Sequence, residues 1–569
     1  MPQRATKGPN HTVNRERPAG ALTRLTLQTI GPRRKIQAPG VRQGMESMAS
    51  GSDTLKLPYA IPPLLLLSLA ASQVIAHTNS GPGKVANTVA GLDACAPAQH
   101  CVELAIAALG GRDKLESIKD IRLDVLSNTQ LAEQSYRQAP FITSYERDHL
   151  TLDLAGRRVL NAAHSFWPES DPKQAESDSL LIVTPAGGVY RNDSKDSPCS
   201  GAALDNANQA LALGPIRLLL TAAAAADLHT APAETLRSTP HAVVAFSWNR
   251  IPVRILINPY NHLPDAVETV QQFRDFWYFW GDVTQRVYFD NWQLFAGVVY
   301  PTNQVTERNG LTWSSSQVFD LEFNVPLDEK QLTVDATAAQ HSTESKGWKR
   351  SLPTSDSTTL APGVDLYPGP WNSTLVREPD GIVILESPIS STFTESLFAE
   401  ARRKYPDVPI KAIVSTSDSW PHVGGIRFDV AQGIPVYILD LNRALLERML
   451  AAPHTIDPDA LTHSQRRPAW QIVSGKTVVS SGANRMELYP LRGAATERQF
   501  MVYFPEHRLL YASDTLVINP DHSLYDPELM REVVTAVERE HLGVDTIFAM
   551  HQAPIPWAQA LDLVHKATT

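Results

Sequence analysis

The stretch Lys411–Ile426, KAIVSTSDSWPHVGGI, decides the fold expected for the last third of this 569-residue chain. It begins with an apolar run, Lys411 to Val414, which is typical of a short buried strand. A polar loop follows and ends in His422-Val423-Gly424-Gly425. The stretch therefore predicts a strand-to-loop junction that carries a histidine.

Strands and helices alternate around this junction, from about residue 361 to the end of the chain. Thr394–Tyr405 has the amphipathic pattern of a helix, and a longer helical pattern covers 527–541. Two hairpin-like pairs of strands are expected between these helices, at 471–490 and 499–513. Mixed alternation with late hairpins predicts two packed sheets with helices outside them.

Five short patterns occur in order along this region. They are Asp380–Glu386 (DGIVILE), Ser417–Gly425 (SDSWPHVGG), Gly493–Thr496 (GAAT), Phe504–Asp514 (FPEHRLLYASD) and Phe548–His551 (FAMH). Together they resemble the metallo-β-lactamase superfamily, in which a loop of pattern H-x-H-x-D-H collects metal ligands. The resemblance implies an αββα metallo-β-lactamase-like sandwich over 361–569.

The resemblance also implies where metal ligands would stand, and one of the two family sites is lost. Ser417 and Ser419 take the positions of the first two histidines, and Ala495 takes that of a third. Hydroxyl and methyl groups are poor ligands for Zn²⁺, which prefers imidazole, thiolate or carboxylate. The first metal site is therefore expected to be absent.

The second family site keeps three of its four ligands, His422, Asp514 and His551, while Pro421 replaces an aspartate. Two imidazoles and one carboxylate suffice for a catalytic zinc with one open position. The resemblance thus implies at most one Zn²⁺, activating water to hydrolyse a small ester, lactone, thioester or amide. Pro421 can neither ligate a metal nor accept a proton, so no residue is assigned as general acid or base.

Alternatives stay open at this site. The histidines can be inherited loop residues that hydrogen-bond to Asp514 or to water without a metal. Asp418 can instead swing in as a substitute carboxylate ligand. Ser417 or Ser419 beside His422 suggests a nucleophile and its base, although the sequence indicates no third group to orient the histidine.

The region 98–337 has a different pattern, in which short strand-like runs follow a helix that ends at Gly110-Gly111. An aromatic-rich hairpin is expected over Phe273–Asp290. The runs Ala108–Leu115 and Asn291–Pro301 resemble parts of the half-barrel of lipoprotein carriers and related exported proteins. This resemblance implies an alternative function, a non-catalytic binding protein whose aromatic half-barrel captures an apolar ligand. In the other interpretation, the aromatic sheet packs on the protein's own helix.

The expected fold class is therefore α+β, with a β-rich half-barrel followed by the αββα sandwich. The linker between them is placed at 338–360, which is rich in Ser, Thr and Lys and lacks periodicity. The expected organisation is a leader and signal peptide over 1–76, a flexible segment over 77–97, the half-barrel domain over 98–337, the linker, and the metallo-β-lactamase-like domain over 361–569.

The N-terminal residues favour export. The apolar run Ile61–Ala71 is shorter than the roughly 20 residues of a bilayer span. Val74-Ile75-Ala76 follows it and predicts cleavage of a signal peptide after Ala76. The expected location is periplasmic or secreted, with no stable membrane span after cleavage. Such a compartment permits a disulfide between Cys95 and Cys101, which would leave Cys199 unpaired; three ordinary thiols are the alternative.

The distribution of charge indicates which kinds of partner the protein can bind. Residues 1–44 hold nine of the 51 basic residues and one of the 60 acidic ones, which leaves 42 basic and 59 acidic residues beyond them. A body that acidic is a poor binder of nucleic acid, because neutralising phosphates needs clustered Lys and Arg. The expected partner is a small-molecule or apolar ligand.

Overall fold

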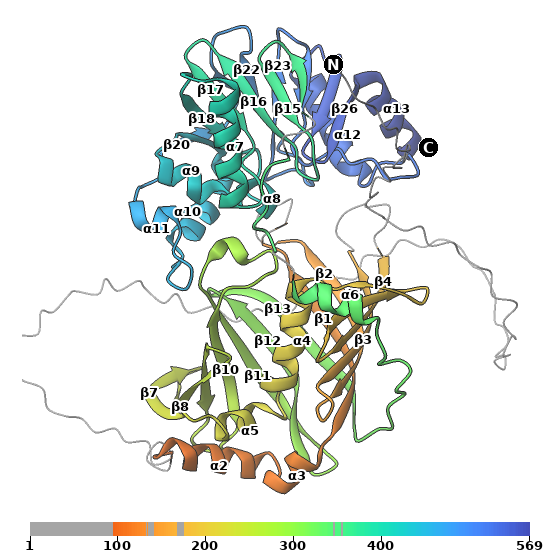
Figure 1. Cartoon of the computed structure of the whole chain (residues 1–569), viewed down its shortest axis with the longest axis vertical. Helices are drawn as coiled ribbons and strands as arrows, with labels where there is room; N and C mark the ends of the chain where they lie inside the picture. The colour runs from red at the N-terminus through yellow and green to blue at the C-terminus, as the bar shows by residue number, and fades with distance from the viewer. Residues whose placement is uncertain are drawn as a thin grey trace, which may run out of the picture. The chain divides into compact units, whose positions relative to one another are not determined.

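The computed structural model describes residues 95–132, 134, 141–167, 176–344, 347–353 and 357–568. Within these residues, three sheets of thirteen, seven and six strands are combined with helices (Figure 1). The predicted α+β class is confirmed. The described residues belong to a single unit by their contacts. The predicted leader and signal peptide (1–76) and most of the predicted flexible segment (77–97) lie outside the described residues.

The largest sheet is antiparallel, and its strand order is β6-β5-β4-β3-β2-β1-β13-β12-β11-β10-β9-β8-β7. Its strands are β1 (Asp120–Gln130), β2 (Thr143–Asp153), β3 (Arg158–Phe166), β4 (Glu176–Thr184), β5 (Gly187–Asn192), β6 (Lys195–Pro198), β7 (His229–Leu236), β8 (Thr239–Trp248), β9 (Ile251–Ile257), β10 (Pro264–Gln271), β11 (Val283–Phe295), β12 (Val298–Arg308) and β13 (Leu311–Phe323).

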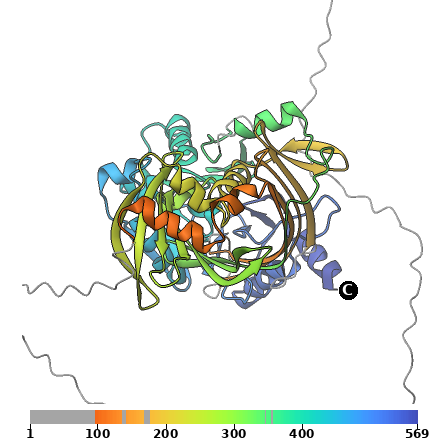
Figure 2. The ribbon, with the colours of Figure 1, turned by 90° about the horizontal axis from the view of Figure 1, so that it is seen from below.

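Helices cover one face of this sheet, which curves around them (Figure 2). They are α2 (Ala98–Ala108), α3 (Arg112–Ser117), α4 (Gly201–Leu213) and α5 (Leu218–Ala223). Strand β9 shows the two-residue period that separates the faces: Val253 and Ile255 join the core under the helices, whereas Leu256 joins a cluster on the other face. The core of this region is therefore formed by the helices and the inner face of the sheet.

The aromatic hairpin predicted over Phe273–Asp290 is wrong. Strand β11 pairs with β10 instead, and the segment between them is a loop with a short 3₁₀-helix, η1 (Tyr278–Trp280). The backbone N–H of Trp277 donates to Asp275 Oδ1 at 2.9 Å, which turns the chain away from an extended course. The aromatic side chains of this loop pack against the last third of the chain rather than along a sheet face.

The other two sheets belong to the last third of the chain. The seven-stranded sheet contains β14 (Thr358–Ala361), β15 (Val364–Tyr367), β16 (Ser373–Glu378), β17 (Gly381–Leu385), β18 (Ile410–Val414), β19 (Val436–Leu439) and β20 (Trp470–Val473). The six-stranded sheet contains β21 (Thr477–Val479), β22 (Met486–Pro490), β23 (Phe500–Phe504), β24 (Leu509–Tyr511), β25 (Thr546–Ala549) and β26 (Gln552–Pro556).

The apolar runs that predict buried strands here are buried on both faces. In β17, Ile382 and Ile384 pack under the helices, whereas Val383 and Leu385 join a core shared with strands of the six-stranded sheet. Strand β18 lies parallel to β17, and parallel strands covered on both faces read as continuous apolar runs. The predicted pair at 471–490 divides between the sheets, because β20 pairs with β19 and β21 pairs with β22.

Helices lie on the outer faces of the two sheets (Figure 1). They are α7 (Ser391–Lys404), α8 (Trp420–Val423), α9 (Ile426–Gln432), η2 (Asp440–Asn442), α10 (Arg443–Ala451), α11 (Ala460–Ser464), α12 (Pro527–Arg539) and α13 (Trp557–Thr568). Ser390 begins α7, since its hydroxyl accepts a hydrogen bond from the Phe393 N–H at 3.2 Å. Asp526 begins α12 in the same way by accepting from the Glu528 N–H at 3.0 Å.

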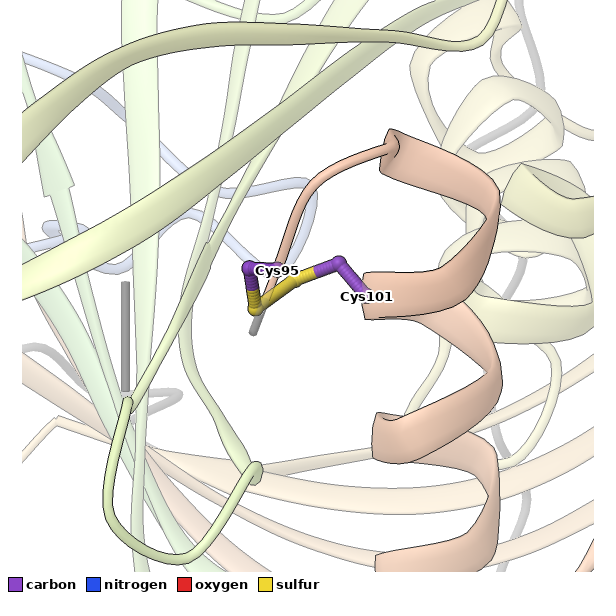
Figure 3. The surroundings of a disulfide bond; sticks show 2 residues. All are labelled: Cys95 and Cys101. Atoms are coloured by element: carbon purple, nitrogen blue, oxygen red, sulfur yellow. A yellow bond between two sulfur atoms is a disulfide. The ribbon is translucent and has the colours of Figure 1, made fainter. Parts of the chain in front are cut away.

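Three further features bear on the expectations. Cys95 and Cys101 are joined in a disulfide (Figure 3), and Cys199 is a buried free thiol. The range expected as a linker, 338–360, holds most of α6 (Ala336–Thr343) and the beginning of β14, and the domain boundaries stay predictions. In the part of the chain that the structure describes, no helix combines the length and the apolar character needed to cross a membrane.

Candidate functional site

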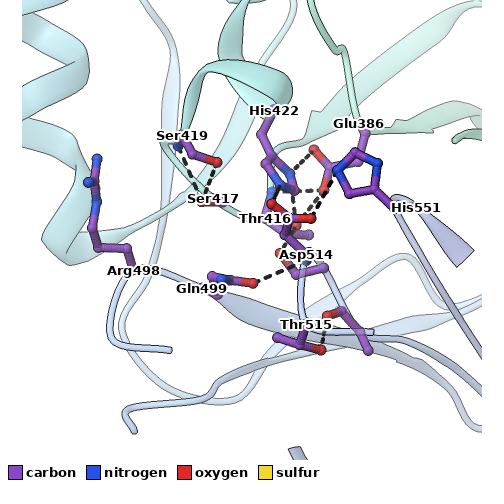
Figure 4. A network of polar contacts seen from close by, with 12 residues as sticks. Glu386, Thr416, Ser417, Ser419, His422, Arg498, Gln499, Asp514, Thr515 and His551 are labelled. Atoms are coloured by element: carbon purple, nitrogen blue, oxygen red, sulfur yellow. Dashed lines mark hydrogen bonds and ion pairs between the residues drawn. The ribbon is translucent and has the colours of Figure 1, made fainter. Parts of the chain in front are cut away.

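The predicted site residues follow the ends of neighbouring strands. Strand β18 ends at Val414 and leads through a loop to His422 on α8, while β24 and β25 lead to Asp514 and His551 respectively. Strands β24 and β25 are parallel, so their carboxyl ends lie at the same edge of the sheet. The fold therefore places Asp514 and His551 at one edge of the six-stranded sheet. His422, from the loop after β18 of the seven-stranded sheet, meets them there (Figure 4).

The structure brings all three predicted residues together. His551 Nε2 lies 3.1 Å from Asp514 Oδ1, and His422 Nε2 lies 3.9 Å from Asp514 Oδ2. The two imidazoles thus approach one carboxylate through their ε nitrogens. The backbone N–H of Asp514 donates to Gln499 Oε1 at 3.1 Å, which helps to hold this residue in place.

Both histidines are oriented by a contact on the other side of the ring. His551 Nδ1 donates to the carbonyl of Pro370 at 2.6 Å. His422 Nδ1 lies 3.0 Å from Glu386 Oε2, and both of these side chains are fully buried. An oxygen beside Nδ1, from an accepting carbonyl at His551 and from an ion-paired carboxylate at His422, sets the ring so that Nε2 faces the shared carboxylate. This is the usual arrangement around metal-binding histidines.

Glu386 is a member of the candidate site that the sequence analysis did not identify. It follows β17 with a positive φ of 69°, and its Oε1 accepts from the hydroxyl of Thr416 and, at 3.2 Å, from that of Tyr511. The sequence marks it only as a glutamate where the family resemblance expects an aspartate. A buried carboxylate directly after an apolar strand is the signal that could have identified it, because such a charge needs partners.

The charges of this network are interdependent. Burial alone would lower the pKa of His422, but the Glu386 and Asp514 carboxylates outweigh it and raise the pKa to about 10. Burial would raise the pKa of Asp514, yet His551 and His422 hold it well below its usual range. The pKa of His551 is raised by Asp514 against the opposing effect of burial. Without a cation, the residues therefore form an ion-paired cluster that is buried at His422 and partly exposed at Asp514 and His551.

The donor set fits a divalent cation. Two imidazoles and one carboxylate are ligands that zinc prefers. His422 Nε2 is buried, and among the described residues it has no hydrogen-bond partner. The spacing is nevertheless that of an ion-paired cluster: within the described ranges, no group of three or more His, Cys, Asp or Glu side chains is arranged to hold a metal ion. Binding would thus require the three side chains to adjust around the ion.

The positions of the lost metal site are occupied by other contacts. Ser417 Oγ donates to Ser419 Oγ at 3.3 Å and accepts from the Ser419 N–H at 3.2 Å. The Ala495 N–H donates to Glu532 Oε1 at 3.1 Å. Neither a hydroxyl pair nor a backbone amide supplies a zinc ligand of the usual kind.

Asp418 is not placed to serve as a substitute ligand. Its carboxylate forms a buried ion pair with Arg498, and both side chains are fully buried. Releasing Asp418 would leave the guanidinium buried without its counter-charge, which is strongly unfavourable. The hypothesis that Asp418 swings into the site is therefore not supported by its contacts.

The hypothesis that Ser417 or Ser419 is a nucleophile requires a hydrogen bond to His422. Glu386 supplies the third group that the sequence did not reveal, since it orients His422. In the described part of the chain, however, no hydrogen bond joins Ser417 or Ser419 to that imidazole; the two serines bond to each other. A nucleophile needs its base within hydrogen-bond reach, so these serines are not placed for attack.

A pocket of about 290 Å³ opens beside the cluster. Asp514 and His551, whose side chains are 27% and 29% exposed, contribute to its lining together with Ser417, Ser419 and Gln499. His422 lies beneath them and is fully buried. A small molecule in this pocket would therefore contact the exposed half of the cluster.

Comparisons with known proteins give similarity of fold over part of the chain. No family model and no curated protein matches it. Among solved structures, a secondary alkylsulfatase from Pseudomonas is 15% identical, covering 37% of this chain and 40% of its own, with a TM-score of 0.28. The DIM-1 metallo-β-lactamase is 17% identical over 37% of this chain and 97% of its own (TM-score 0.30). A metallo-β-lactamase from Pontibacter korlensis is also 17% identical, over 37% and 98% (TM-score 0.28). These similarities concern fold alone and carry no information about activity.

Proposed function

We propose that this chain is a hydrolase-like protein with a metallo-β-lactamase-like αββα domain and a reduced metal centre. His422, Asp514 and His551 would hold one divalent cation, with zinc as the metal that suits their donor atoms. The substrate class is a small ester, lactone, thioester or amide. The proposal extends to export, with the mature chain in the periplasm or outside the cell.

One observation carries this proposal: both imidazoles turn their ε nitrogens toward Asp514 while their δ nitrogens are held by Glu386 and Pro370. Histidines that merely remained from an ancestor would need no such common direction. Contacts of this kind around metal ligands typically raise metal affinity by about 10- to 100-fold.

The protein's own residues have distinct roles in this scheme. Asp514, at the pocket wall, fixes where the reacting group lies, and the Gln499 side chain holds its backbone. Glu386 keeps His422 oriented from beneath. When bound, a divalent cation supplies Lewis acidity, polarising a carbonyl and lowering the pKa of water. Hydrolysis adds the hydroxyl of water to the acyl carbon and its remaining proton to the departing oxygen, nitrogen or sulfur.

The apolar-ligand alternative is less well supported. The aromatic side chains predicted to line the half-barrel include Phe273 and Trp277, which pack against the last third of the chain instead. A cavity between α4 and strands β10–β12 has a volume of about 150 Å³. Pockets that bury a drug-sized ligand measure about 300–1,000 Å³. This cavity is smaller than such a ligand needs. A larger pocket of about 1020 Å³ beside α4 is lined in part by charged and polar side chains, including Arg157, Asp205 and Asn208, which suit an apolar ligand poorly.

Metal content tests the proposal. Tag-free full-length protein would be incubated with zinc sulfate, desalted and measured by inductively coupled plasma mass spectrometry. We expect about one equivalent in the wild type and most of it lost in His551→Ala, since a zinc site needs at least three protein ligands. His463→Ala, which removes an exposed histidine from α11, is the matched control and should keep the wild-type value. Less than about a tenth of an equivalent in the wild type, unchanged in His551→Ala, would refute the metal centre.

A further inference from the structure

The pocket beside Asp514 and His551 is completed by residues from the first half of the chain. Gln134, Ile142 and Trp167 line it together with the residues already described. Gln134 and Ile142 lie in the connection between β1 and β2, and Trp167 follows the end of β3. The wall of the candidate site thus includes side chains from the 13-stranded-sheet region.

Arg498 connects this wall to the loop that follows β18 and holds Ser417 and Ser419. Its Nη1 donates to the carbonyl of Ala132 at 3.1 Å, and its guanidinium lies 5.6 Å from the centre of the Phe141 ring. The same guanidinium forms the buried ion pair with Asp418, which lies between Ser417 and Ser419 in the loop after β18. Within the connection itself, the Leu131 N–H donates to the Ile142 carbonyl at 3.0 Å. These contacts give the wall a defined position relative to the cluster.

The wall differs in chemistry from the rest of the pocket. Ile142 and Trp167 are apolar, as are two other lining residues, Val517 and Leu529. The polar part of the lining includes Ser417, Ser419, Gln499, Asp514 and His551. The lining includes two carboxylates, Asp514 and Asp526, and its described residues include no lysine or arginine. An anionic group entering the pocket would therefore find only His551, which is already paired with Asp514, whereas an uncharged apolar group would find a matching surface.

We infer that the apolar wall formed by Ile142 and Trp167 determines substrate specificity, selecting a small uncharged substrate with a short alkyl or aromatic group. That group lies against the wall, and the hydrolysable polar group faces Asp514 and His551. The inference rests on the proposed function for the reaction, but the binding preference comes from the wall alone. A volume of about 290 Å³ limits the ligand to a small molecule.

Binding of simple probes to metal-free protein tests the inference without relying on metal. Phenylacetamide, acetamide and phenylacetate would be titrated into full-length protein that has been dialysed against a chelator, with binding followed by ligand-observed NMR. Phenylacetamide should bind more tightly than acetamide, which lacks the ring, and more tightly than phenylacetate, which carries a charge. Trp167→Ala should weaken phenylacetamide binding by about tenfold, as expected for losing an aromatic contact in a buried pocket.

Two controls keep the outcome interpretable. Phe319→Ala, which removes a 64% exposed aromatic side chain from β13, should leave phenylacetamide binding unchanged. The zinc content of Trp167→Ala should equal that of the wild type, because this residue is not one of the proposed ligands. Equal affinity for phenylacetate and phenylacetamide, or unchanged binding in both Trp167→Ala and Ile142→Ala, would overturn the inference. A wild type that binds phenylacetamide as expected but takes up no zinc would refute the proposed function and support the inference that the wall sets the binding preference.

Discussion

Glu386 Oε2 lies 3.0 Å from His422 Nδ1, and neither side chain has any exposed surface. A carboxylate and an imidazole buried together are stable only if each has further partners. Glu386 has the hydroxyls of Thr416 and Tyr511, and His422 faces Asp514. The pair therefore forms the base of the candidate site and sets the direction of the buried imidazole.

Replacing Glu386 by glutamine tests this role. The amide keeps the size of the side chain but removes the charge that orients and polarises His422. We expect zinc affinity to fall by about 10- to 100-fold, as for other contacts behind metal-binding histidines. Competition with a chromophoric chelator measures the affinity. Glu378→Gln, a change at another buried glutamate of the same sheet, is the control and should leave zinc affinity unchanged. An affinity equal to that of the wild type in Glu386→Gln would contradict a positioning role.

The ion pair of Asp418 and Arg498 should contribute to stability rather than to chemistry. Asp418→Asn leaves the guanidinium buried without a counter-charge, which costs about 3–5 kcal/mol of unfolding free energy. The double change to Asp418→Asn and Arg498→Met removes both charges and should recover a large part of the loss. Urea denaturation followed by circular dichroism measures both variants. A double variant as unstable as the single one would mean that the loss does not come from the unpaired charge.

Phe276 connects the loop of the first half to the turn that carries His422. Its ring stacks on Trp420 with centroids 4.7 Å apart, and Trp420 begins α8 two residues before the histidine. Phe276→Ala should lower the free energy of unfolding by about 3 kcal/mol, the lower end for removing a packed aromatic side chain. It should also weaken zinc binding through the displaced turn. The exposed Phe319→Ala should change stability by less than about 0.5 kcal/mol.

Asp429 makes stability depend on pH. Burial within α9 raises its pKa to about 8, against a smaller opposing effect of the Ser387 hydroxyl. Because the folded state holds this proton more tightly than the unfolded state, stability should fall as pH rises from about 4 to about 8. Asparagine at position 429 cannot ionise, so Asp429→Asn should remove this contribution. The variant should therefore lose less stability than the wild type between pH 4.5 and pH 8.5. Urea midpoints at the two pH values measure the difference, and an equal difference in both proteins would contradict the assignment.

The last third of the chain was largely predictable because its signals are local. Gly381–Leu385 and Lys411–Val414 are apolar on both faces and form adjacent parallel strands, β17 and β18. His422, Asp514 and His551 each follow such a strand, which is why their meeting could be expected. Whether they bind a metal depends on the spacing of their donor atoms, which no sequence pattern reveals.

The rest depended on contacts between distant segments. The aromatic residues after β10 have a pattern that fits a hairpin, but Phe276 packs against Trp348 and Trp420 instead. The wall of the pocket depends on Arg498 meeting Ala132, two residues 366 positions apart. Local periodicity predicts strands and helices, whereas such long-range partners are chosen by packing in the folded state.

Anomalous diffraction at the zinc absorption edge, from crystals of the full-length protein grown with zinc, tests the metal centre most directly. We expect one strong anomalous peak with Asp514 and the ε nitrogens of His422 and His551 at about 2.0–2.2 Å from it. Anomalous density at other positions alone, with His551 and Asp514 still in direct contact, would contradict the account.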